Sequence, residues 1–279
     1  MKIILSRKGF DSAWGGCPSP VLPDGTMLSM PIPTDENTGI TYEDILYNNV
    51  SYLDIWKQLR PRQTSFPTYC HLDPDLRKDV RSVPEDWRAA FGQVDASQTH
   101  LENQGVGIGE LFLFFGWFRE TDYSKNGKLR YKPETYGKHM LYGYLQVGSI
   151  LNGEDVANLT WHPHSNLGIY RETNNTIYIA SEKLSRTDLP GYGTFRYDDA
   201  LVLTKENCSR SRWNLPEFFK EVHISHHNQN SFKDGFFQSV PIGQEFVISE
   251  DERIIDWAYN IVLNYSRHRL IIASTPEKH

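Results

Sequence analysis

Hydrophobic residues in this chain gather in short runs that are separated by turns rich in glycine and proline. The longest run, residues 111–118, reads LFLFFGWF and contains five aromatic residues. Because polar residues do not alternate within it, this run predicts a strand buried on both faces. A second run, residues 140–150, predicts a neighbouring strand in the same sheet or barrel. Shorter patterns predict strands at residues 2–5, 69–76 (running into a proline turn), 176–181, 200–203 and 246–248, and a hairpin within residues 21–33.

Helical spacing of hydrophobic residues is clearest at residues 250–264, where Ile254, Ile255 and Ala258 share one face. Residues 52–59 show the same spacing, and shorter helices are expected at residues 84–92, 95–103 and 213–219. The pattern contains no internal repeat and no evident linker. We therefore expect an α+β fold in a single domain, residues 1–279, with an aromatic-rich mixed or antiparallel β core and flanking helices.

Composition mainly excludes classes of protein. Apolar residues make up 39% of the chain and charged residues 23%, which argues against collagen, coiled coil and extensive disorder. The longest apolar run is far shorter than the ~20 residues of a membrane-spanning helix, and the N-terminus does not read as a signal peptide. We therefore expect a cytoplasmic protein without membrane partners.

Charge and cysteine content narrow the expected chemistry. The net charge of −6 argues against general coating of nucleic acid, although a local basic pocket remains compatible with it. The three cysteines are far apart and odd in number, which argues against a disulfide framework or a cysteine-rich zinc site. The motifs of P-loop kinases, Rossmann enzymes, α/β hydrolases and cytidine-type deaminases are absent from the sequence.

Basic residues stand at two places that suit a phosphate group. Arg7, Lys8 and Asp11 follow the first predicted strand and precede a Gly-Gly turn, so they can bind phosphate and position a proton acceptor. A surface turn with an internal ion pair explains the same residues. Arg210 lies between Ser209 and Ser211, two residues before Arg212, where it suits a phosphate grip or a solvated helix start.

A second candidate cluster begins with His71, Asp73 and Asp75. Alternation along an extended chain places His71 and Asp73 on the same side. Two carboxylates and a histidine suit a divalent metal or general acid–base catalysis, whereas an Asp-Pro-Asp turn is the structural alternative.

Histidines also flank a proline in the segment Trp161-His162-Pro163-His164. Two histidines in a loop fixed by proline can bind a metal or contact a base edge, and packing beside the tryptophan explains them equally well. A third histidine group, His223, His226 and His227, has no accompanying metal-site motif and is unspecific.

Eight segments occur in one order along the chain: SRKGFDSAWGGCPSPVLPDG, HLDPDL, GELFLFFGWFR, LYGYLQVG, WHPH, NNTIYIAS, SRSRWNLPEFF and GQEFV. With them, residues 3–257 resemble the family called nucleotide modification associated domain 3. That family is grouped with systems of phages and bacteria that modify DNA bases, so the resemblance implies a pathway and no particular reaction. The central strand pair also resembles that of PUA-like barrels, which implies a nucleobase in an aromatic pocket.

These observations predict a protein of a DNA-modification system that handles a nucleobase or nucleotide, with nucleotide or DNA as its partner. We expect an aromatic pocket formed by Trp117, Tyr142 and Trp161, with phosphate-binding and acid–base residues around it. The alternatives are a non-catalytic PUA-like reader of a modified base and a metal-dependent enzyme. The candidate acid–base residues are Arg7, Lys8, Asp11, His71, Asp73 and Asp75, and the candidate binding residues are Trp117, Tyr142, Trp161, His162, His164 and Arg210.

Overall fold

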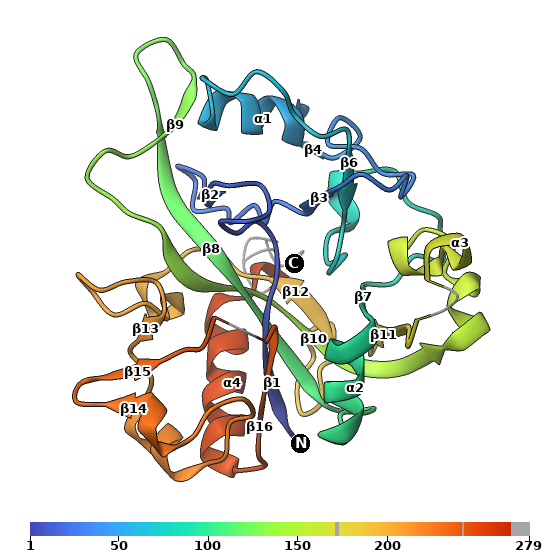
Figure 1. Ribbon diagram of the computed structural model, residues 1–279, viewed down its shortest axis with the longest axis vertical. Coiled ribbons are helices and arrows are strands. Elements are labelled where there is room, and N and C mark those ends of the chain that lie inside the picture. The colour runs from blue at the N-terminus through green and yellow to red at the C-terminus, as the bar shows by residue number, and fades with distance from the viewer. Residues whose placement is uncertain (171–172, 242, 269–279) are drawn as a thin grey trace, which may run out of the picture.

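The computed structural model describes residues 1–170, 173–241 and 243–268 (Figure 1). Its main feature is a nine-stranded mixed sheet with the strand order β16–β1–β8–β10–β11–β7, in which β2 and β9 also pair with β8, and β12 pairs with β10. The strands of this sheet are β1 (Ile3–Arg7), β2 (Ser19–Val21), β7 (Ala90–Gln93), β8 (Leu111–Tyr123), β9 (Leu129–Tyr131), β10 (Lys138–Asn152), β11 (Thr176–Ala180), β12 (Tyr192–Thr194) and β16 (Glu245–Ile248).

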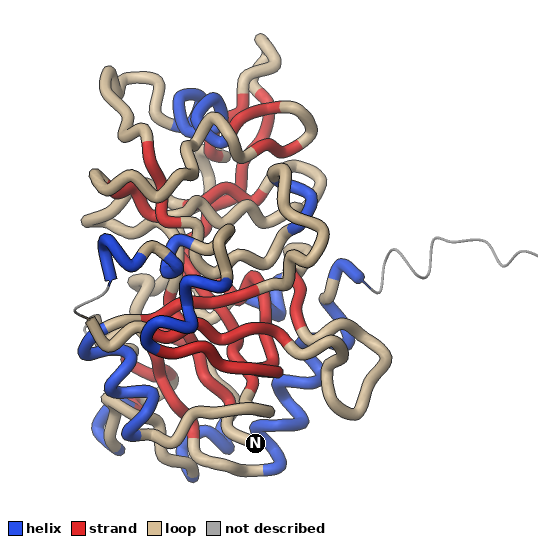
Figure 2. The backbone as a smooth tube through the Cα atoms, turned by 90° about the vertical axis from the view of Figure 1, so that its right-hand side faces the viewer, coloured by secondary structure: helices blue, strands red, loops and turns tan. Residues whose placement is uncertain are grey.

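Smaller sheets and four α-helices complete the described part of the chain. Most long strands lie in one half of the molecule, while the other half consists mainly of loops, short strands and α1 (Figure 2). The remaining strands are β3 (Ile32–Thr34), β4 (Leu46–Tyr47), β5 (Val50–Ser51), β6 (Tyr69–His71), β13 (Arg212–Trp213), β14 (Phe232–Lys233) and β15 (Phe236–Gln238). The helices are α1 (Tyr52–Leu59), α2 (Asp95–Asn103), α3 (Leu167–Tyr170) and α4 (Glu252–Tyr265). The mixed α+β class is confirmed.

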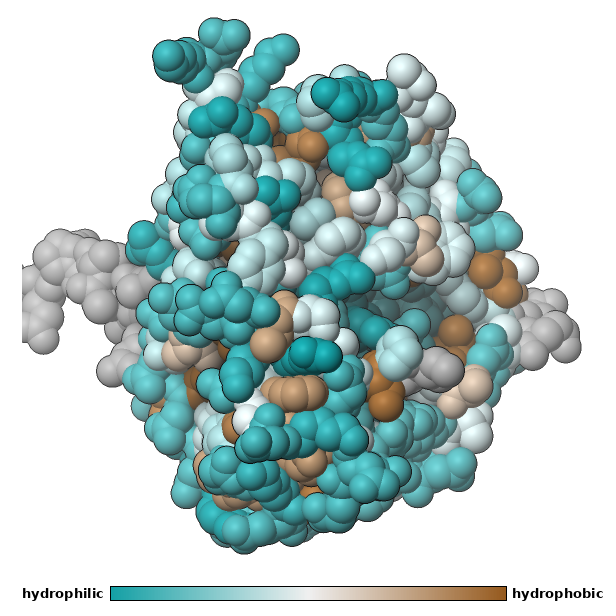
Figure 3. All heavy atoms as spheres, turned by 60° about the vertical axis from the view of Figure 1, so that its left-hand side comes forward, coloured by the Kyte–Doolittle hydropathy of each residue, from teal (hydrophilic) through white to brown (hydrophobic). Residues whose placement is uncertain are grey.

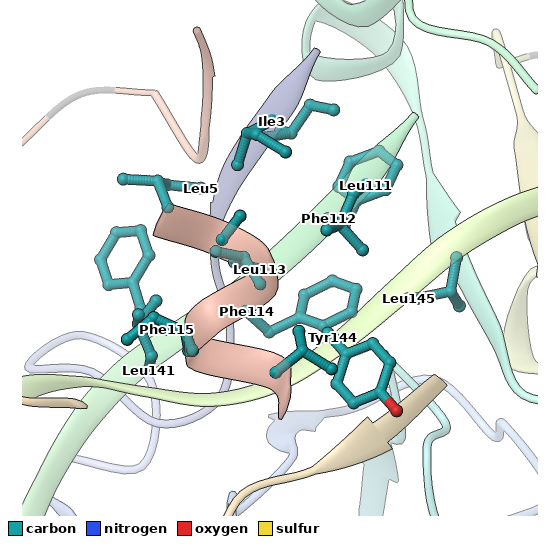
Figure 4. Packing of buried hydrophobic residues seen from close by; sticks show 14 of the residues in the cluster. Ile3, Leu5, Leu111, Phe112, Leu113, Phe114, Phe115, Leu141, Tyr144 and Leu145 are labelled. Carbon is teal, nitrogen blue, oxygen red and sulfur yellow. The ribbon is translucent and has the colours of Figure 1, made fainter. Parts of the chain in front are cut away.

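Strands β8 and β10 form the predicted central pair, antiparallel and buried on both faces. Their aromatic and aliphatic side chains pack with those of β1 and with the apolar face of α4 (Figure 4). The pairing shifts register between Leu141 and Gly143, where a bulge bends the strand. A Cβ atom at Gly143 would lie 2.9 Å from the carbonyl oxygen of Gly193, so the close approach of β12 requires glycine there.

The sheet curls but does not close into the barrel that the central strand pair suggested. Strands β16 and β7 end the path, and no backbone pairing joins them in the described ranges. Instead, Gln93 Nε2 donates a hydrogen bond of 2.6 Å to Glu245 Oε1 across the gap. Strand β7 ends at Gln93, and the chain enters α2 at Asp95.

Three local predictions differ from the structure. Residues 84–92 were expected to form a helix, yet β7 occupies the end of this segment because its backbone pairs with β11. In place of the strand expected at residues 200–203, a 3₁₀ turn, Asp199–Leu201, ends there, and Val202 forms an isolated β-bridge with Met140. The helix expected at residues 213–219 is a 3₁₀ turn, Glu217–Glu221, which follows the short strand β13.

The face in Figure 3 is mainly hydrophilic, with hydrophobic residues only in small areas. None of the helices in the described residues has the length and apolar character needed to cross a membrane. Cys17, Cys70 and Cys208 are free thiols.

Candidate functional site

The residues at the end of β1 face two different surroundings. Arg7 lines a surface cavity, and its Nη2 donates hydrogen bonds of 2.7 Å to the carbonyl oxygens of Pro241 and Gly243. Lys8 lies in the interior with a side chain only 8% exposed, and its Nζ is 3.0 Å from Glu245 Oε1. The fold therefore separates two basic residues that the sequence suggested as one phosphate-binding group.

The surface cavity has a volume of about 410 Å³. It lies between the segment after β1 and the loops that flank β13 and β15. Its polar lining consists of Arg7, Asp11, Ser12, His139, Ser209, Arg210, Ser211 and Ser239, and Trp117 adds an aromatic ring.

Arg210 connects the two sides of this cavity. Its Nη2 donates a hydrogen bond of 2.7 Å to Ser12 Oγ. Its guanidinium carbon lies 4.1 Å from the centre of the Trp117 ring, a cation–π contact that covers one face of the indole. The surface available for stacking here is therefore the planar guanidinium group supported by Trp117, because Arg210 occupies that face of the ring.

Asp11 shapes the rim of the cavity. Its Oδ1 accepts hydrogen bonds of 2.7 Å from the backbone N–H groups of Ala13 and Trp14. The turn continues through Gly15, whose φ of +82° and contact with Phe10 leave no room for a Cβ atom. The turn leaves Trp14 54% exposed close in sequence to the cavity.

Positive charge dominates the lining of the cavity. Burial lowers the pKa of Arg7, although Asp11 and Glu245 oppose this effect. Burial also lowers the pKa of Arg210; Asp11 opposes this shift and the charge of Arg7 adds to it. Two partly buried guanidinium groups thus repel each other beside Asp11, the carboxylate of the lining, and a bound anion would relieve that repulsion.

His139 forms part of the buried wall behind the cavity. Its Nδ1 accepts a hydrogen bond of 3.1 Å from Trp213 Nε1. Burial lowers the pKa of His139 to about 3, and the nearby charges of Arg210 and Arg7 act in the same direction. The imidazole is therefore neutral at physiological pH, with its proton on Nε2.

A second group of polar residues lies where β6, β7 and the 3₁₀ turn Pro163–Ser165 meet. Strand β6 pairs with β3 and ends at His71, and Asp73 follows two residues later. His71 Nε2 lies 3.1 Å from His164 Nε2, and each of these nitrogens lies 4.0 Å from Asp73 Oδ2. His162 Nε2 lies 3.4 Å from the other carboxylate oxygen, Oδ1. The fold thus unites two segments that are far apart in the sequence.

Hydrogen bonds determine the tautomers of the two histidines that flank Pro163. Asn175 Nδ2 donates to the carbonyl oxygen of His164 at 2.8 Å, so the amide oxygen Oδ1 must face His164 Nδ1, also at 2.8 Å. His164 therefore carries its proton on Nδ1 and has a lone pair on Nε2. In contrast, His162 Nδ1 accepts a hydrogen bond of 3.3 Å from the backbone N–H of His164, which places the His162 proton on Nε2, toward Asp73.

Burial sets the charges of this group. It lowers the pKa of His71 to about 4 and that of His164 to about 3, although Asp73 opposes both shifts. Burial alone would raise the pKa of Asp73, but the contact with His162 and the charges of nearby histidines and Lys8 hold it well below its usual value. At neutral pH the group contains an ionised carboxylate and neutral imidazoles at His71 and His164.

The other candidate residues lie outside these two groups. Asp75 is 1% exposed, and its Oδ2 accepts hydrogen bonds from Arg81 Nη2 at 2.6 Å and Trp87 Nε1 at 2.9 Å, a role in packing. Tyr142 lines a small interior cavity beside Asp75. Trp161 packs against both the main hydrophobic cluster and a smaller one beside β11. The three rings expected to form one aromatic pocket are thus distributed over three surroundings.

The structure also adds residues that the sequence reasoning did not select. Tyr170 stacks on the His164 ring, with ring centres 4.7 Å apart, and its hydroxyl lies 3.3 Å from His71 Nδ1. The backbone N–H of Gly92 donates a hydrogen bond of 2.8 Å to Asp73 Oδ1. Asn175, which holds His164, lies in a segment that carries the family resemblance, whereas Gly92 and Tyr170 lie outside those segments.

Comparison with known proteins gives one family and no individual relative. The sequence model of the family described as nucleotide modification associated domain 3 matches residues 2–249. No curated protein and no solved structure matches the chain. Because the match covers most of the chain, this protein belongs to the nucleotide modification associated domain 3 family.

Proposed function

From its membership of this family, we propose that the protein binds a nucleotide, free or within DNA, in the cavity lined by Arg7 and Arg210, as part of a DNA-modification system. The observation that supports this most is the pair of partly buried guanidinium groups beside Asp11 in the lining of the cavity. A phosphate group offers the charge and the acceptor oxygens that two guanidinium groups require.

The size and lining of the cavity suit the rest of a nucleotide. A volume of about 410 Å³ lies within the usual range of small-molecule sites, which begins at roughly 300 Å³. The guanidinium plane of Arg210, supported by Trp117, can stack on a base, and the exposed Trp14 can add a second aromatic surface. Asp11 then acts as the hydrogen-bond or proton acceptor for the base.

The positions of the basic side chains decide which of them we propose as phosphate contacts. We assign Lys8 to the interior, because its ammonium group pairs with the buried Glu245 and is removed from the cavity. The phosphate contacts then come from Arg7 and Arg210, and the serines of the lining supply hydroxyl groups.

Calorimetric titration of the protein with nucleoside monophosphates and short single-stranded oligodeoxynucleotides, with ordinary and modified bases, tests this proposal. Arg210→Ala should weaken binding at least tenfold, which corresponds to about 1.4 kcal/mol. Arg212→Ala is the matched control, because Arg212 makes a similar cation–π contact with Phe236 but does not line the cavity. Equal binding by both variants and the wild-type protein would contradict the proposal.

The same oligonucleotides separate catalysis from recognition. A change in the mass of an oligonucleotide after incubation indicates an enzyme, and tight binding without any mass change indicates a reader of a modified base. In either case Asp11→Asn should alter which base is bound, because an amide presents both a donor and an acceptor where the carboxylate only accepts.

A further inference from the structure

Three ligand atoms converge in the second polar group, and their spacing suits a metal ion. The distances of 3.1, 4.0 and 4.0 Å between His71 Nε2, His164 Nε2 and Asp73 Oδ2 define a triangle. The point in the plane of these atoms that is equidistant from all three lies about 2.2 Å from each, close to the lengths of zinc–nitrogen and zinc–oxygen bonds. These three residues are also the one group in the described residues whose ligand atoms all lie within 4.8 Å of one another.

We propose that His71, Asp73 and His164 bind a divalent first-row transition-metal ion through Nε2, Oδ2 and Nε2, and that the remaining coordination positions stay open to water or substrate. Two imidazoles and one carboxylate form a donor set of the kind that binds iron(II) or zinc. The inference does not depend on nucleotide binding in the surface cavity, since no residue of the triad lines it.

Surrounding hydrogen bonds orient the proposed ligands. Asn175 holds the proton of His164 on Nδ1, which leaves the Nε2 lone pair directed at the triad. The Gly92 N–H and the His162 side chain lie at Asp73 Oδ1, so the carboxylate presents Oδ2 to the metal. Support of this kind from neighbouring groups is typical of metal sites.

Two further features of the site fit a bound metal ion. A Cβ atom at position 92 would lie 2.3 Å from the His164 ring, so glycine is needed to admit this imidazole. His162 is 2% exposed and its Nε2 forms no hydrogen bond in the described structure, although it points at Asp73. If a metal ion binds Asp73 through Oδ2, the buried His162 Nε2 lies on the other side of the carboxylate, at Oδ1, where it can support the ligand.

The competing explanation is a metal-free hydrogen-bond chain. In that chain Tyr170 donates to His71 Nδ1, and His71 Nε2–H donates to His164 Nε2. Metal binding would move the His71 proton to Nδ1, where the Tyr170 oxygen can accept it, because a hydroxyl group both donates and accepts. The two explanations therefore differ in a measurable quantity, the affinity for a metal ion.

Titration of chelator-treated full-length protein with Co²⁺, followed by its visible absorption and by calorimetry, tests the inference. We expect one equivalent to bind to the wild-type protein, and His71→Ala, Asp73→Asn and His164→Ala each to weaken binding at least 100-fold. His226→Ala is the matched control, because it removes one histidine of another pair. The ring centres of His226 and His100 lie 4.1 Å apart.

Two measurements keep the test decisive if a triad variant folds poorly. Near-ultraviolet circular dichroism of each variant in chelator identifies those that retain the native fold, and X-ray absorption of the Co²⁺-loaded wild-type protein counts imidazole ligands without any substitution. Two imidazoles support the inference. No bound Co²⁺, a spectrum without imidazole ligands, or loss of binding in His226→Ala in place of the triad variants overturns it.

Discussion

Replacement of His139 by asparagine should remove a specific part of the acid sensitivity of this protein. His139 is 8% exposed and accepts a hydrogen bond from Trp213 through Nδ1. An asparagine Oδ1 can take the place of that nitrogen and accept the same hydrogen bond, but the amide does not titrate. The loss of ring contacts with Phe115 and Trp213 costs stability at every pH.

The size of the pH effect follows from the pKa of the buried imidazole. Burial lowers this pKa to about 3 in the folded protein, whereas the unfolded chain has the ordinary value of about 6.5. Below pH 6.5 the unfolded chain takes up a proton that the folded protein refuses, so stability falls as the pH falls toward 3. Between pH 7 and pH 5, His139 alone should lower the free energy of unfolding by about 2 kcal/mol.

Urea unfolding of the wild-type protein and His139→Asn at pH 7 and pH 5 measures this effect. The wild-type protein should lose about 2 kcal/mol more than the variant between the two pH values, because other groups titrate equally in both proteins. His223→Asn, which replaces an exposed histidine, should leave the wild-type difference unchanged. If His139→Asn destabilises the protein equally at both pH values, the neutral buried imidazole is refuted.

Three further substitutions test single features of the fold and the site. Asp75→Asn should lower the free energy of unfolding by about 3 kcal/mol, because it leaves the charge of Arg81 without its buried partner. Urea unfolding measures this loss, and a change below about 1 kcal/mol would refute a structural role for the ion pair. Gly92→Ala should destabilise the protein by about 2 kcal/mol or more, because the new Cβ atom collides with the His164 ring, and a thermal midpoint equal to that of the wild-type protein would show that the ring moves freely. Ser51→Ala should cost about 1 kcal/mol through loss of the N-cap of α1, and an unchanged urea midpoint would count against that cap.

Local patterns in the sequence were sufficient for the elements whose own residues define them. The unbroken apolar runs of β8 and β10, and the helical spacing in α4, correspond closely to the observed elements. Burial on both faces and a 3.6-residue period depend on neighbouring positions alone, so they can be recognised without the fold. The proximity of His71 to Asp73 was predictable for the same reason, since they lie two positions apart on an extended chain.

Partners distant in the sequence decided the rest. Strand β7 was mistaken for a helix because its pairing with β11 is a tertiary contact that local propensity does not encode. The approach of His164 to His71 spans 93 positions, and that of Arg210 to Ser12 spans 198. The sequence by itself determined the fold class, the central strands and the types of residue available for chemistry. Only the tertiary structure decided which of them meet, because long-range packing sets their positions. At the end of β1, for example, Arg7 lines the surface cavity whereas Lys8 pairs with Glu245 in the interior.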